Sequence, residues 1–169
     1  NKPTNASTTV TGTTASSSHI YDVAKNITPN EYALTGYTFK GWNTASNGSG
    51  TACANNASVK NLTATDGATV TLYAKWDANK YDIDFREEGG STVSDQTVIF
   101  DSTTNNEVAV PNREGYTFNG WFTQQSGGIM VYNADGTCAK NTVYWDVNGK
   151  WINPDDVILY AQWTANTYT

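Results

Sequence analysis

Residues 36–42 read GYTFKGW, and residues 115–121 read GYTFNGW. Each is followed downstream by a second pair of near-copies, VTLYAKW at 70–76 and VILYAQW at 157–163. The first pair lies 79 residues apart and the second 87, so the later copy carries an eight-residue insertion. Self-similarity at a fixed spacing is the signature of a repeat array. The sequence therefore predicts two similar units in tandem.

The repeated stretches have the composition of strands. Aromatic and β-branched residues fill the first stretch, and the period of two places Tyr37 and Phe39 on one face. Trp42 would fall on the other face unless Gly41 marks a β-bulge, a common use of glycine inside a strand. The stretch 70–76 alternates cleanly, as a half-buried antiparallel strand does. We expect β-dominated units with mostly antiparallel strands.

The unit boundaries follow from the repeat. The first unit covers residues 1–77 and the second covers 78–165, with the insertion around 124–152. The second unit opens with YDIDF at 81–85, whereas the first unit has no comparable first strand. Residues 166–169 repeat the start of that strand and predict the beginning of a following one.

Composition and charge restrict the possible partners. Of the 169 residues 15% are charged, and the net charge is −6, so no basic surface is expected for nucleic acid. No apolar run is long enough to span a membrane. Residues 1–80 carry +2 and residues 81–169 carry −8. This division is explained by two solvated surfaces, and the alternative is end-to-end steering of oppositely charged units.

Catalytic or metal-binding groupings are not evident. His19 is the single histidine, and we interpret it as a strand-edge residue rather than as part of a catalytic triad. The turns at 133–136 and 146–149 have weak similarity to calcium loops, but hairpin turns explain both without a metal. A calcium ion shared between these loops is the alternative. We therefore predict no enzyme activity and no cofactor.

The two cysteines occupy similar places in the two units. Cys53 and Cys138 should lie about one unit apart, beyond the roughly 7 Å Cα separation that a disulfide allows. Buried free thiols are expected, and a bond between neighbouring chains is the alternative.

The aromatic residues divide into two sets. The first set belongs to the repeated motifs and is predicted to form the cores with two leucines. The second set lies in or near the insertion, and would form a binding surface for glycan or protein if it were exposed. The predicted core residues are Tyr37, Phe39, Trp42, Leu72, Trp76, Tyr116, Phe118, Trp121, Leu159 and Trp163; the candidate surface residues are Tyr132, Tyr144, Trp145 and Trp151.

The order of these motifs resembles the internalin-type B-repeat, also called the Listeria–Bacteroides repeat. A tyrosine-led strand, a Gly-rich turn, GYTFNGW and a closing LYAQW occur in that order over residues 81–163, and in part over 19–76. The resemblance implies small β-grasp-like modules of an α+β type, each with about four strands and one short helix or helical crossover. It also implies an extracellular or cell-surface protein of bacterial or archaeal origin, without catalytic residues.

Together these features predict a structural stalk, fibre or adhesive segment of a surface protein. A glycan-binding module that uses the second-unit insertion is the alternative. The expected partners are adjacent repeats or other copies of the chain in head-to-tail contact, with Thr167, Tyr168 and Thr169 as a strand that pairs with the next unit. The competing hypothesis is that Thr8–Thr14 supplies the missing first strand of the first unit.

Overall fold

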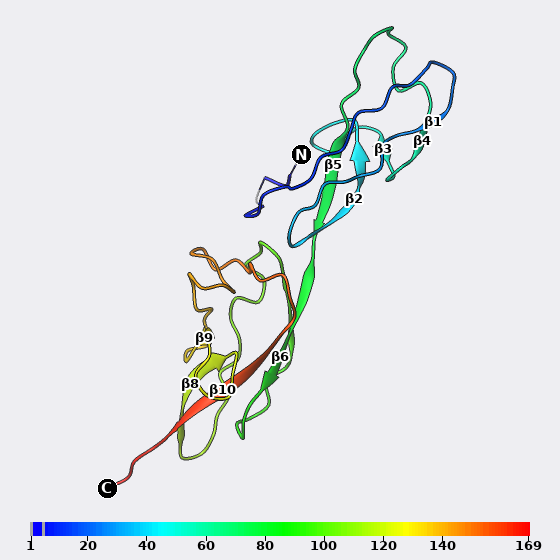
Figure 1. Ribbon diagram of the computed structural model, residues 1–169. Coiled ribbons are helices and arrows are strands. Elements are labelled where there is room, and N and C mark those ends of the chain that lie inside the picture. Colours follow the sequence, from blue (N-terminus) through cyan, green and yellow to red (C-terminus); the bar gives the residue numbers. More distant parts are fainter. Residues whose placement is uncertain (1, 5) are drawn as a thin grey trace. The chain divides into compact units, whose positions relative to one another are not determined.

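The computed structural model describes residues 2–4 and 6–169 (Figure 1). The chain divides into unit 1, Asn1–Ala78, and unit 2, Asn79–Thr169. Both units are built from β-strands and turns, and the described residues contain no helix. The chain is thus β-dominated, and its strand pairs are antiparallel with one exception.

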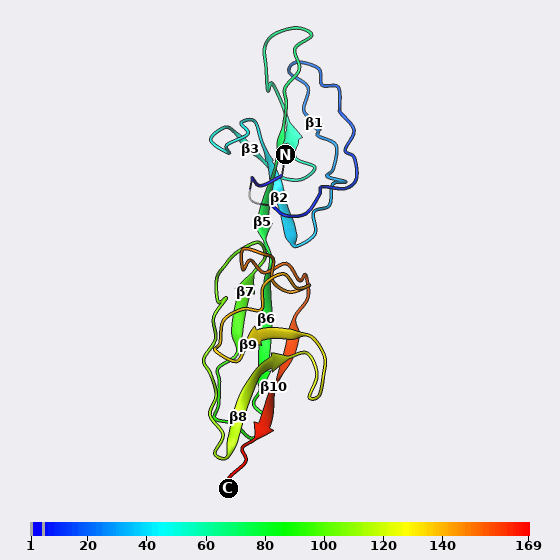
Figure 2. The same ribbon diagram turned by 90° about the vertical axis from the view of Figure 1, so that its left-hand side faces the viewer.

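Unit 2 is organised around one five-stranded sheet with the order β7-β6-β10-β8-β9 (Figure 2). The central strand β10 pairs in parallel with β6 and antiparallel with β8. The first and last strands of the unit are therefore direct neighbours. The strands are β6 (Lys80–Arg86), β7 (Gln96–Ile99), β8 (Tyr116–Phe122), β9 (Met130–Asn133) and β10 (Val157–Ala165).

The core of unit 2 forms where the alternating apolar residues of these strands meet. Ile83 and Leu159 are fully buried, and Phe85 is 2% exposed. The ring of Phe85 contacts Trp121 edge-on, with 4.6 Å between the ring centroids. Such edge-to-face pairs add to the stabilisation from apolar burial.

A β-bulge interrupts the GYTF strand in both units, which confirms the role predicted for Gly41. In unit 1 the register shifts between Phe39 and Gly41. In unit 2 Phe118 faces Trp163 and Gly120 faces Gln162, so Asn119 is the extra residue. The two glycines have φ values of 132° and 129°, which L-residues with a side chain rarely adopt. The bulge turns Trp42 toward the same core as Phe39. The centroids of these two rings are 5.0 Å apart.

Unit 1 has a smaller three-stranded sheet with the order β3-β2-β5, and a separate pair, β1-β4. Its core includes Ile27, Trp42 and Ala74, with Phe39 and Trp76 packed against them. The strands are β1 (Lys25–Asn26), β2 (Tyr37–Asn43), β3 (Ala52–Cys53), β4 (Ser58–Val59) and β5 (Tyr73–Ala78).

The amino-terminal part of unit 1 contains little regular structure. Residues 19–23 form no strand, and residues 25–26 pair with β4. Within the described part of residues 1–18, Thr11 makes one isolated bridge to Ala33, and no strand forms. Thr8–Thr14 therefore does not supply a first strand for the sheet.

The connection from β7 to β8 in unit 2 consists of turns and extended chain. The resemblance predicts a helix or helical crossover there, but residues 100–115 are not helical. Asp101 and Asn105 have φ values of 56° and 57°, in the left-handed region that ends a right-handed helical turn. Pro111 lacks the N–H that would continue a helix.

The insertion folds as a hairpin-like loop, as the Asn148–Gly149 turn predicts. Trp145 and Trp151 form an isolated antiparallel bridge. Asp146 N donates to Lys150 O at 2.9 Å, and Asp146 Oδ1 accepts a bond from Asn148 N at 2.8 Å. These bonds close the turn.

Candidate functional site

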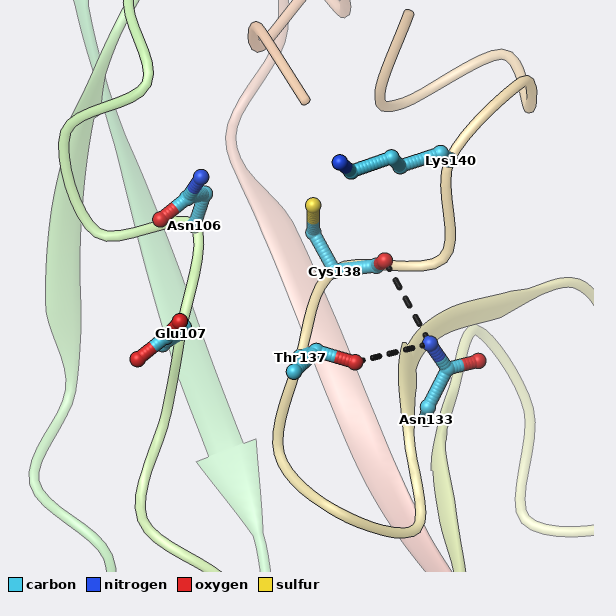
Figure 3. A pocket seen from close by; sticks show the side chains of 6 residues that line it. All are labelled: Asn106, Glu107, Asn133, Thr137, Cys138 and Lys140. Carbon is cyan, nitrogen blue, oxygen red and sulfur yellow. Dashed lines mark hydrogen bonds between the residues drawn. The ribbon is translucent and has the colours of Figure 1, made fainter. Parts of the chain in front are cut away.

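A hollow with a volume of about 390 Å³ lies in the described surface of unit 2. Its walls are two segments joined by the Glu107–Thr137 bridge. Cys138 N donates to Asn106 O at 2.8 Å, and Asn133 Nδ2 donates to Thr137 Oγ1 at 3.0 Å. The lining residues are Asn106, Glu107, Asn133, Thr137, Cys138 and Lys140 (Figure 3).

The hollow has little capacity for nucleophilic chemistry. Cys138 is 4% exposed, and burial raises the pKa of its thiol, while the nearby Lys140 ammonium lowers that pKa by a smaller amount. Figure 3 shows the end of the Lys140 side chain beside the sulfur, with Asn106 on the opposite wall. A thiol that keeps its proton is a weak nucleophile, and no histidine is among the lining residues. The hollow thus presents polar groups to solvent without an activated one.

The predicted aromatic binding surface is instead part of the interior. Tyr132, Trp145 and Trp151 are all 0% exposed, and Tyr144 is partly buried. The Trp145 and Trp151 rings are 4.9 Å apart, and Tyr132 Oη donates to Asn105 O at 2.8 Å. The hairpin folds these rings onto the sheet, so they enlarge the core of unit 2. No exposed aromatic platform forms from this set.

The predicted core residues occupy three kinds of environment. Tyr116 is 37% exposed, which corrects its core assignment, and the Arg113 guanidinium lies 3.8 Å above its ring centroid. This contact holds the ring at the surface. Buried residues are Tyr37, Trp42, Phe118, Trp121 and Leu159, and partly buried ones are Phe39, Leu72, Trp76 and Trp163.

His19 and two carboxylate side chains have local structural contacts. His19 Nε2 shares a hydrogen bond with Ser17 Oγ at 2.8 Å. Glu87 Oε1 accepts a bond from Val93 N, and Asp156 Oδ1 accepts one from Asp82 N, both at 2.8 Å. Within residues 2–4 and 6–169, no group of three or more His, Cys, Asp or Glu side chains is placed to hold a metal ion.

The cysteines and the chain end complete the set of predicted residues. Cys53 and Cys138 are both buried free thiols. Thr167, Tyr168 and Thr169 lie beyond the end of β10 and form no strand, and Tyr168 is 78% exposed. In the part of the chain that the structure describes, no helix is long and apolar enough to span a membrane.

The hollow beside Cys138 was not predicted from sequence. Its walls come from residues 106–107 and 133–140, which the Glu107–Thr137 bridge brings together. The NADG turn at 133–136 marks one wall, but no local pattern indicates its pairing with the other.

Comparison with known proteins agrees with the repeated architecture. The model of the Listeria-Bacteroides repeat domain matches residues 8–75 and again residues 81–144. Internalin H of Listeria monocytogenes is 33% identical over 131 residues, which cover 78% of this chain and 20% of that protein. A glycine-rich protein of Evansella cellulosilytica, named as a membrane protein, is 35% identical over 143 residues, covering 80% of this chain and 15% of the relative.

A second Evansella cellulosilytica protein, also named as a membrane protein, is 34% identical over 100 residues. The chain spans between 13% and 20% of the lengths of these three relatives. Two tandem matches to one family model account for most of its residues. The chain belongs to the Listeria-Bacteroides repeat family.

Proposed function

We propose that this chain is a non-catalytic segment of a bacterial surface protein, in which the two repeats act as a spacer that resists tension. Its family membership and the names of its longer relatives support a place in a surface or membrane-associated protein. The tandem repeats support a structural role, because a repeat array adds length without adding chemistry.

One observation carries the mechanical part of the proposal, namely the parallel pairing of β6 with β10. Four residue pairs join these strands, from Ile83–Val157 to Arg86–Tyr160. Tension on the unit pulls β6 from its amino end and β10 from its carboxyl end. Because the strands are parallel, the pull slides one strand past the other and loads all the pairs together. Peeling an antiparallel end pair would instead break the bonds one after another.

Apolar packing adds to this resistance. Ile83 and Leu159 are fully buried on the paired strands, and Phe85 packs against Trp121. Any sliding of β6 along β10 would expose these side chains to water, at about 25 cal/mol for each Å² uncovered. The strands are therefore held by hydrogen bonds and by the core together.

We also infer that unit 2 is a β-grasp-like fold whose helix is replaced by an irregular crossover. The parallel neighbours β6 and β10 support this reading, as do the antiparallel pairs β6-β7 and β8-β10 on either side. The glycan-binding alternative is not favoured, because the aromatic residues on which it depended are buried.

Single-molecule pulling of the full chain through its two ends tests the proposal. Ile83→Ala removes packing at the β6–β10 pair, and Val131→Ala removes packing on β9; both parent side chains are 0% exposed. We expect Ile83→Ala to reduce the unfolding force of unit 2 more than Val131→Ala does. Each reduction in force is compared with the loss of stability that the same variant shows in denaturant. Equal reductions in force would contradict a role for the parallel pair.

A further inference from the structure

The two units differ at one side of their sheets. By the repeated motifs, β2, β3 and β5 of unit 1 correspond to β8, β9 and β10 of unit 2. In unit 2, β10 is flanked by β8 on one side and by β6 on the other, with β7 beyond β6. In the described part of unit 1, β5 has β2 as its one strand neighbour. The described residues of unit 1 therefore form no strand at the places of β6 and β7.

The strand β5 is shortened where that neighbour is missing. β10 covers Val157–Ala165, whereas β5 covers only Tyr73–Ala78. With the closing motifs aligned at their spacing of 87, the lost residues Val70–Leu72 correspond to Val157–Leu159. Those residues of unit 2 pair with β6. Leu159 is fully buried, while Leu72 is only partly buried.

The residues of unit 1 that correspond to the end of β7 and the residues after it are also exposed to solvent. At the 79-residue spacing, Tyr21 corresponds to Phe100 and Asp22 to Asp101. The backbone supports this match, because both aspartates have positive φ, 61° and 56°. Phe100 is 1% exposed, but Tyr21 is 59% exposed and the adjacent Ile20 is 73% exposed. Apolar side chains that unit 2 covers are thus accessible to solvent in unit 1.

The described residues at the sequence position of β6 form no strand. Tyr81, Ile83 and Phe85 correspond to Lys2, Thr4 and Ala6, which carry no large apolar side chain. Pro3 lies among them and cannot donate a backbone hydrogen bond to a neighbouring strand. The described part of unit 1 therefore leaves β5 without a strand neighbour on the side where β10 pairs with β6.

We propose that unit 1 accepts an added strand between residues 19–22 and residues 70–73. The occupant is the first strand of another Listeria-Bacteroides repeat, an extended segment with the Tyr-x-Ile-x-Phe alternation of Tyr81–Phe85. It runs parallel to residues 70–73 and antiparallel to residues 19–22, as β6 does between β10 and β7. Main-chain hydrogen bonds would supply affinity, and the alternating side chains would supply specificity.

This inference rests on the proposed function, because a protein built from such repeats supplies the strand. It is nevertheless tested separately. Strand addition concerns unit 1 and is measured by binding, whereas the resistance of unit 2 to tension is measured by pulling. Either result can fail while the other holds.

A synthetic peptide with the sequence of residues 79–88 is the probe, titrated into the full chain. Binding should be accompanied by slower amide hydrogen exchange at residues 70–73, with no change in unit 2. The same peptide carrying Ile83→Asp and Phe85→Asp should not bind. No binding by the first peptide, or equal binding by both, would contradict the proposal.

Two chain variants locate the site. Tyr21→Asp should weaken peptide binding at least about tenfold, because strand addition would bury its carboxylate. Val147→Asp is the matched control, since Val147 is 69% exposed and belongs to unit 2; its affinity should be unchanged. Both parent side chains are exposed, so neither change should alter the melting temperature of the free chain. Equal affinities of the two variants would place the peptide elsewhere.

A fusion provides a second measurement that does not depend on the affinity of the free peptide. The sequence of residues 79–88 is placed before residue 1 through a flexible Gly/Ser linker, which raises its effective concentration to the millimolar range. The fused strand should raise the melting temperature of unit 1 and protect residues 70–73 from exchange. If neither occurs, the strand site does not exist.

Discussion

The tryptophans of the two repeated motifs in unit 2 have different environments. Trp121 is fully buried, whereas Trp163 is partly exposed and lies across Gly90. Trp163 Nε1 donates to Glu87 O at 3.0 Å, so the ring also fastens the turn after β6. The sequence predicts both residues as core, because periodicity identifies the inward face but not the depth of a side chain below the surface.

The contact between Gly90 and Trp163 gives a prediction for unit 2. A Cβ atom on Gly90 would lie 2.5 Å from Trp163 Cζ2, so Gly90→Ala should destabilise the unit by about 1–3 kcal/mol. Denaturant unfolding measures the loss. In a Trp163→Phe background the shorter ring leaves room for the methyl group, so the loss should become smaller. The same loss in both backgrounds would show that this contact is not its cause.

Tyr132 predicts a loss of stability at alkaline pH. Burial is the main cause that raises the pKa of its phenol above the ordinary value of about 10, and the neighbouring Cys138 adds to the rise. The unfolded chain therefore releases this proton first. The stabilisation is complete below about pH 10 and is lost as the pH rises further, by about 1.4 kcal/mol per pH unit.

Unfolding in denaturant at several pH values, with Tyr132→Phe as the control, measures this effect. The variant loses the hydrogen bond to Asn105 O but cannot ionise at that position. Its stability should fall less steeply above pH 10 than that of the parent. Parallel curves would mean that the phenol is not held in its neutral form.

At the level of elements, the repeated bulge is the feature that the sequence predicts best. The glycine in GYTFxGW is explained by a local requirement, because a φ near 130° is open to glycine and costly for other residues. The close approach of backbone is a second requirement. A Cβ atom on Gly120 would lie 2.7 Å from Tyr132 O, on the neighbouring strand β9.

Gly120→Ala should therefore cost about 1–3 kcal/mol of stability through backbone strain and the contact with β9. Gly127→Ala is the control, since its φ of 67° lies in the left-handed region but no atom lies within 4 Å of its added Cβ. Thermal and denaturant unfolding should show the larger loss for Gly120→Ala. A larger loss for Gly127→Ala would contradict the importance of the bulge.

Elements that depend on distant partners were predicted less well. Residues 19–23 (HIYDV) have strand composition, yet in the described part of the chain no strand pairs with them. The aromatic residues of the insertion could have formed either an exposed binding surface or part of the core. Their burial depends on the bridge between Trp145 and Trp151, which the local sequence does not show. Tyr116 has the same motif position as Tyr37 but stacks with Arg113, which has no arginine counterpart in unit 1. Local pattern indicates element type, whereas burial requires the tertiary partner.

For the whole molecule, the two units offer a comparison within one chain. Under tension applied through the chain ends, both units experience the same force. Unit 2 has a parallel pair between its first and last strands, and the described part of unit 1 has no such pair. Their unfolding forces can therefore be compared in identical solution conditions.

Pulling the unmodified chain at a constant loading rate is the most direct test of a spacer that resists tension through its parallel strands. Two unfolding events should occur, and their extensions should identify the units from their different lengths, Asn1–Ala78 and Asn79–Thr169. Unit 1 should unfold first and at the lower force, and unit 2 should follow at a distinctly higher force. Unfolding of unit 2 at or below the force of unit 1 would contradict the proposed function.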